Sequence, residues 1–162
     1  MSRSPHANSP TRSLRRPLGL TLLTGYDVLL VALLPALVAI VDFFGTAPVA
    51  RPPTYQILAT LLLSGAVLWA ASGTRSGESG MRYGLVVLVT LYYVGVMFGT
   101  PYTVDPAGVL YMSAGDVNPT MEQVLRIGRS LFWILLHGWY LLGGPTEDFF
   151  EARARQLSAL QE

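Results

Sequence analysis

The chain contains neither cysteine nor lysine, and it has few charged residues of any kind. The absence of cysteine excludes disulfides, thiol catalysis and metal sites with cysteine ligands. The only histidines are His6 and His137, and His6 lies in a polar tail, so we do not expect a haem held by two histidines. All eleven basic residues are arginine, a bias that reflects the base composition of the gene rather than a mechanism. The composition therefore predicts no cofactor.

The sequence also lacks the short motifs of common reaction centres. It has no His-Glu-x-x-His, no Gly-x-Ser-x-Gly, no P-loop and no dinucleotide fingerprint. Asp105 and Asp116 could reach a metal ion, but nothing fixes their geometry. We interpret them as helix caps and solvated groups, with Asp105 starting a short interfacial helix that runs to Met112. The net charge of +1 does not indicate nucleic-acid binding. These absences predict that the protein is not an enzyme.

Long apolar stretches make up most of the chain. Hydrophobic residues account for 51% of it and charged residues for 13%, against about 25% charged in soluble domains. Four stretches approach the ~20 helical residues that cross a bilayer. They are Leu18–Phe44, Thr54–Ser72, Tyr83–Gly99 and Val124–Leu142. We therefore expect an all-α integral membrane protein, with a four-helix transmembrane bundle over residues 18–143 and the lipid bilayer as its solvent.

The N-terminal segment, residues 1–17, is rich in Ser, Pro and Arg and is predicted to be a disordered cytoplasmic tail. Arg15 and Arg16 precede an apolar run, which is also typical of a secretory or twin-arginine signal. However, the run exceeds the roughly 7–15 residues of a signal's apolar region, and it contains Asp27. These two features favour a first membrane helix that is retained.

The C-terminal segment, residues 144–162, is predicted to be an amphipathic cytoplasmic tail. Thr146 followed by Glu147 and Asp148 is typical of a helix start. The apolar side of this helix would consist of Phe149, Phe150, Leu157 and Leu160. We expect a short interfacial helix that lies on the membrane surface. The alternative is a solvated tail that orders only on a partner.

The distribution of arginine predicts the orientation in the cell membrane, because basic residues accumulate on the cytoplasmic side. With the N-terminus inside, eight arginines lie inside and three outside. The inside set is Arg3, Arg12, Arg15, Arg16, Arg75, Arg82, Arg153 and Arg155, and the outside set is Arg51, Arg126 and Arg129. Both termini are therefore predicted to be cytoplasmic.

The last apolar stretch carries a narrow polar face. With about 100° per residue, its ionisable and amphipathic side chains lie within about 60° of Arg126. They are Glu122, Arg126, Arg129, Ser130, Trp133, His137 and Tyr140. Ionisable groups inside a membrane usually face protein or a water-filled cavity, so this face could line a polar pathway or pocket. Alternatively, Arg126 and Arg129 reach the outer headgroups while the other residues pack against neighbouring helices.

The first stretch carries two carboxylates, Asp27 and Asp42, at depths that match polar residues on the last stretch. Asp27 lies about 13 Å and His137 about 9 Å from the same end, given ~1.5 Å per residue. Asp42 falls in the same outer third as Arg126 and Arg129. We therefore expect the first and last helices to pack antiparallel, with Asp27 in contact with His137. Such a pair is either a structural tether or a site of proton movement.

Small residues predict close packing of the third stretch. Close backbone approach is permitted by Gly95 and Gly99, and the same side carries Gly84 and Tyr92. Together with the short soluble segments and the absent catalytic groups, this face predicts a non-enzymatic accessory subunit. It would pack against a larger membrane protein partner or form a homo-oligomer. The alternative is a small oligomeric transporter or channel whose polar pathway is lined by the first and last helices. A membrane enzyme acting on lipids ranks third.

Overall fold

The computed structural model describes residues 15–45, 53–98 and 119–159, and every element in these ranges is a helix. In chain order the elements are α1 (Leu18–Tyr26), the π-helical segment η1 (Asp27–Leu33), α2 (Leu34–Gly45), α3 (Thr54–Ser76), α4 (Ser79–Met97), α6 (Pro119–Leu142) and α7 (Gly144–Ala159). The expected helix at Asp105 and the glycine at position 99 lie outside the described residues. The all-helical prediction is confirmed over the described ranges.

Proline and glycine set several helix ends. Pro17 and Pro53 immediately precede α1 and α3, because the proline ring would clash with a preceding helical turn. Gly77 ends α3 in the left-handed conformation, at φ +90°, which costs a residue without Cβ little. The predicted end at Ser72 is therefore wrong. Gly73 stays inside α3, where the absent side chain leaves room for Met81 of α4.

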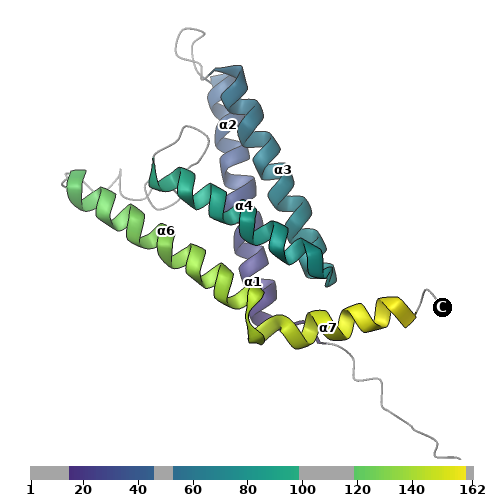
Figure 1. Cartoon of the computed structure of the whole chain (residues 1–162). Helices are drawn as coiled ribbons and strands as arrows, with labels where there is room; N and C mark the ends of the chain where they lie inside the picture. Colours follow the sequence, from purple (N-terminus) through teal and green to yellow (C-terminus); the bar gives the residue numbers. More distant parts are fainter. Residues whose placement is uncertain (1–14, 46–52, 99–118, 160–162) are drawn as a thin grey trace, which may run out of the picture.

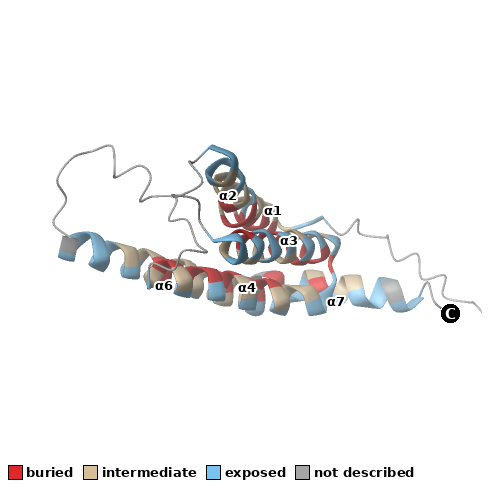
Figure 2. Ribbon diagram, turned by 90° about the horizontal axis from the view of Figure 1, so that it is seen from above, coloured by how far each residue is buried: buried red, intermediate tan, exposed pale blue. Residues whose placement is uncertain are grey.

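The helices form two crossing pairs, visible in Figure 1. The continuous rod α1–η1–α2 packs against α3, and α4 packs against α6. α4 is the central element, since it also contacts α3, η1 and α7. Buried residues line the faces on which the helices meet (Figure 2). The α4 contribution to this core is Leu85, Val89, Tyr92, Tyr93 and Val96.

Three segments are long and apolar enough to cross a membrane: Leu18–Gly45, Thr54–Ser76 and Ser79–Met97. Their outward faces carry large exposed apolar side chains, such as Leu29, Leu62 and Leu91, as expected where lipid is the solvent. α6 is 24 residues long but is less apolar, because it carries the polar face described above. The structure thus supports a helical membrane protein with three candidate spans.

The C-terminal helix α7 packs against the bundle. Phe150 is 1% exposed and belongs to the core, and the Arg82 guanidinium lies 4.9 Å from its ring centre. Arg153 covers Gly77 with its aliphatic part, and its Nε donates to the Ser76 carbonyl at 3.3 Å. α7 is therefore attached to the α3–α4 turn as well as to the end of α6 (Figure 1).

Candidate functional site

The two ionisable residues that the sequence singled out are in direct contact. Nε2 of His137 lies 2.8 Å from Oδ1 of Asp27, and both side chains are completely buried. The predicted contact is confirmed. It joins the start of η1 to the C-terminal half of α6.

The second ring nitrogen of His137 restricts where the protons of this pair can lie. Nδ1 is 2.7 Å from the Trp133 carbonyl oxygen. A carbonyl only accepts hydrogen bonds, so Nδ1 must carry a proton and donate it. The remaining proton then lies between Nε2 and Oδ1, on His137 or on Asp27. Either position leaves the pair with no net charge, which suits a fully buried site.

Two buried polar atoms of η1 and α6 are not satisfied. Asp27 Oδ2 and Ser130 Oγ are buried and make no hydrogen bond within the described part of the chain. Ser130 lies on the same face of α6 as His137 and is fully buried. The predicted polar face of α6 is therefore directed at protein over its C-terminal half. Near its start, Arg126 instead pairs with Glu122 on the same helix, at 3.1 Å.

The π-helical segment explains why Asp42 does not meet Arg126 or Arg129, whose depth in the membrane it was predicted to share. η1 begins at Asp27, and the Leu34 N–H reaches back to the Leu29 carbonyl, the i→i−5 bond of a π-helix. Pro35, which lacks an N–H, follows directly. The wider turns rotate α2 relative to α1, so the regular 100° register does not extend to Asp42. Asp42 is exposed, and α2 diverges from the start of α6, which carries Arg126 and Arg129 (Figures 1 and 2).

Three aromatic residues from three helices pack beside the Asp27–His137 pair. The Tyr26 ring stacks on Trp133, with centroids 4.1 Å apart. The hydroxyls of Tyr26 and Tyr93 lie 3.0 Å apart, within hydrogen-bond distance. Tyr93 is also nearly parallel to Trp133 at 6.5 Å. This cluster ties α1, α4 and α6 together.

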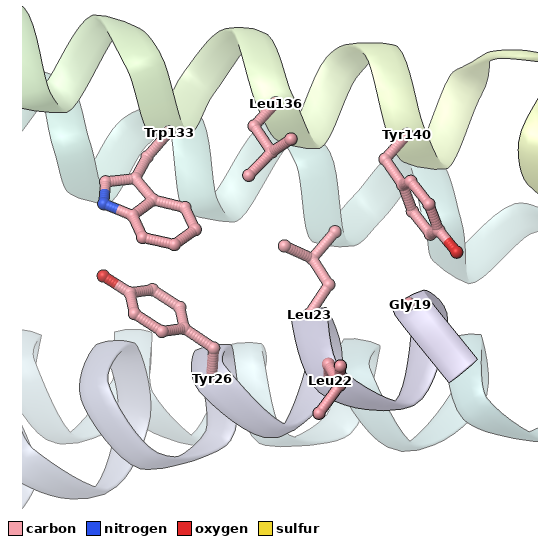
Figure 3. Close-up of a pocket in the computed structure, with 7 residues that line it drawn as sticks. All are labelled: Gly19, Leu22, Leu23, Tyr26, Trp133, Leu136 and Tyr140. Atoms are coloured by element: carbon pink, nitrogen blue, oxygen red, sulfur yellow. The ribbon is translucent and has the colours of Figure 1, made fainter. Parts of the chain in front are cut away.

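A groove of about 360 Å³ runs between α1 and α6 (Figure 3). Its lining residues are Gly19, Leu22, Leu23, Tyr26, Trp133, Leu136 and Tyr140. The Tyr26–Trp133 stack lies at one end and Tyr140, packed directly over Gly19, at the other. The helices are antiparallel here, as predicted. Leu22 is 65% exposed at the edge of the groove, so the groove opens to the outside of the bundle.

Sequence reasoning missed most of the residues that build this groove. Helical periodicity assigns Tyr140 to a polar face, yet its ring fills the space beside Gly19. Tyr26 gave no such signal, because the antiparallel match that aligns Asp27 with His137 brings Tyr26 level with Gly138, five residues from Trp133. The predicted glycine face is less tight than expected at Gly84, where an added Cβ would meet nothing within 4 Å. Gly95 is partly buried at the edge of the α4 core face.

The function of this site has to be argued from its geometry. No protein-family model, no curated protein and no solved structure matches the chain.

Proposed function

We propose that the protein is a four-span membrane protein that acts without catalysis, as an accessory subunit of a larger membrane complex. The observation that carries this proposal is the Asp27–His137 contact, which is fully buried and closed at 2.8 Å. A fully buried pair with no net charge is what a tether between helices requires. A transport site would instead need to exchange its proton or ion with both sides of the membrane.

The fourth span in this proposal is α6. Its 24 residues extend about 36 Å, more than the ~30 Å hydrocarbon core. Its exposed side over the C-terminal half consists of large apolar residues, namely Leu131, Phe132, Leu135, Trp139 and Leu142. The polar groups Ser130 and His137 face inward. This segregation is expected of a helix with one side in lipid and the other against protein.

Four spans would place both termini on the same side, and the arginine asymmetry favours the cytoplasm of the cell membrane. The docking of α7 supports this topology, because it brings the C-terminal helix to the α3–α4 turn, which carries Arg75 and Arg82. The start of α1, with Arg15 and Arg16, lies at the same end of the molecule (Figure 1). All these arginines would then share one membrane surface.

A photo-crosslinking experiment tests the subunit proposal. A photoreactive residue at Leu62 or Trp69, both exposed on α3, is irradiated in native membranes. We expect one defined protein adduct, whereas the same residue at Ser158 of α7 should not form it. Lipid adducts alone at both α3 positions would contradict the proposal.

The second candidate function is a small oligomeric proton transporter, which the unsatisfied Asp27 Oδ2 favours. Purified protein in liposomes distinguishes the two. The subunit proposal expects proton permeability equal to that of empty liposomes. Permeability that disappears in both Asp27→Asn and Asp27→Leu would support transport, because neither side chain titrates.

A further inference from the structure

We propose that the groove between α1 and α6 binds one acyl chain of an anionic phospholipid, with the phosphate near Arg15 and Arg16. The inference rests on the proposed placement of α6 in the bilayer. Within a membrane, a groove that opens to the outside is filled by lipid tails or by another protein. The size, lining and flanking charge of this groove favour the lipid.

The groove is too narrow to enclose a helix. From Gly19 to Tyr26 the groove extends about 10 Å. Its volume of about 360 Å³ over this length gives a mean cross-section of ~35 Å². An α-helix with side chains, ~10–12 Å across, has a cross-section of roughly 80–110 Å². An alkyl chain is a single row of methylene groups and is much thinner. The groove is therefore wide enough to hold a lipid tail and too narrow to hold an entire helix.

The lining of the groove suits a hydrocarbon chain. Leu22, Leu23 and Leu136 form its middle, and the stacked rings of Tyr26 and Trp133 lie at the deep end (Figure 3). Among the described residues that line it, none carries a carboxylate, imidazole or guanidinium. The Asp27–His137 pair has no exposed surface, so it offers nothing to a ligand. Apolar contact is the only attraction available along most of the groove.

The shallow end of the groove is the part suited to a headgroup. Arg15 and Arg16 are exposed immediately before α1, and Gly19 and Tyr140 line the groove at this end. A tyrosine at such a position provides an amphipathic ring at the membrane interface. The cytoplasmic leaflet is rich in anionic lipids, which juxtamembrane arginines attract. The charge beside the groove thus selects an anionic lipid over a zwitterionic one.

Tryptophan fluorescence tests the proposal directly, because Trp133 lines the groove. The variant Trp69→Phe/Trp139→Phe leaves Trp133 as the single tryptophan. The full chain is reconstituted in two sets of phosphatidylcholine vesicles. One set contains phosphatidylglycerol with brominated acyl chains, and the other contains phosphatidylcholine with brominated acyl chains at the same mole fraction. Bromine quenches tryptophan on contact. We expect stronger quenching by the brominated phosphatidylglycerol. Each arginine should raise the ratio of the affinity for phosphatidylglycerol to that for phosphatidylcholine by about fivefold.

Two further variants assign the binding to its parts. Arg15→Gln/Arg16→Gln should bring the affinity ratio close to one without affecting the fold, since both side chains are exposed. Leu136→Phe should reduce quenching by both lipids, because the larger side chain fills the groove. Leu135→Phe is the matched control: Leu135 is 69% exposed on the outer side of α6, and quenching should not change. Equal quenching by both lipids in the parent variant would overturn the proposal.

A second single-tryptophan variant separates a failure of this inference from a failure of the proposed function. Trp69→Phe/Trp133→Phe leaves Trp139, which is 64% exposed and faces away from the groove. If neither lipid quenches Trp139, α6 lies outside the bilayer and both proposals fail. If Trp139 is quenched and Trp133 is not, α6 is in the bilayer and only the groove proposal is overturned.

Discussion

Among single residues, the contact between Asp27 and His137 is the feature with the clearest physical consequence. The imidazole bridges a carboxylate of η1 and a carbonyl of its own helix, and both partners are buried. Loss of one partner leaves the other without a hydrogen bond in a dry site. Such a loss costs about 1–3 kcal/mol, whereas an amide replacement keeps part of the interaction.

We therefore predict a graded response to substitution of Asp27. Asp27→Leu should lower the free energy of unfolding in detergent by about 1–3 kcal/mol, because His137 Nε2 loses its partner. Asp27→Asn should lower it less, since the amide can donate to Nε2. Asp148→Asn, at an exposed position of α7, is the control and should have little effect. A Leu variant as stable as the wild type would show that the contact contributes no stability.

Gly19 offers a second test on a single residue. A Cβ built on Gly19 would lie 2.6 Å from Cζ of Tyr140, so Gly19→Ala must displace the ring. We expect a loss of about 1 kcal/mol in unfolding free energy, at the low end of overpacking substitutions, because the displaced atoms are the far end of the Tyr140 side chain. Gly25→Ala on the same helix is the matched control, because nothing lies within 4 Å of its Cβ. In a Tyr140→Ala background the effect of Gly19→Ala should disappear, and its persistence would refute the close contact.

Among the helices, α7 is the segment whose expected behaviour the structure changes most. The sequence predicted a helix that depends on the membrane surface or on a partner. In the structure, Phe150 reaches the core, and Thr146 donates to the Tyr140 carbonyl at 2.9 Å where α6 ends. These contacts attach α7 to two other elements. The helix should therefore remain ordered in detergent, without a bilayer surface.

The substitution that tests this docking is Phe150→Ala. Removing a buried phenylalanine costs about 3 kcal/mol or more of stability. Here the substitution should weaken the docking of α7 against Arg82. We expect faster amide hydrogen exchange throughout α7, with exchange in α3 little changed. Ser158→Ala, at an exposed position near the end of α7, should leave the exchange rates unaltered. Rapid exchange of α7 already in the wild type would contradict the docked arrangement.

For the molecule as a whole, the topology is the property on which both proposals depend. The chain has no cysteine, so single cysteines can be introduced into an otherwise unreactive protein. We expect a membrane-impermeant maleimide applied to intact cells to label Met121→Cys, at the outer end of α6. Gly80→Cys and Ser158→Cys should be labelled only after permeabilisation. Labelling of Ser158→Cys from outside would refute a cytoplasmic C-terminus.

The class of the protein and the polar match at its centre follow from the amino-acid sequence alone. Apolar length predicts four spans, of which the structure supports three as candidates, and Pro17 and Pro53 mark two helix starts. Depth along a helix follows from a rise of ~1.5 Å per residue, so the positions of Asp27 and His137 in the chain are enough to pair them. These features depend on composition and on local backbone rules, which act within a single helix.

The remaining features arise only where helices meet. The π-helical turns after Asp27 end the regular register, so the position of Asp42 could not be extrapolated. The α1–α6 groove exists because Gly19 admits Tyr140 at one end while Tyr26 stacks on Trp133 at the other. The docking of α7 depends on Gly77 and Arg82, which are distant in sequence from Phe150 and Arg153. The groove and the docking of α7 are contacts between helices. Their shape depends on side chains from different helices, and the periodicity of one helix does not predict which of these side chains meet.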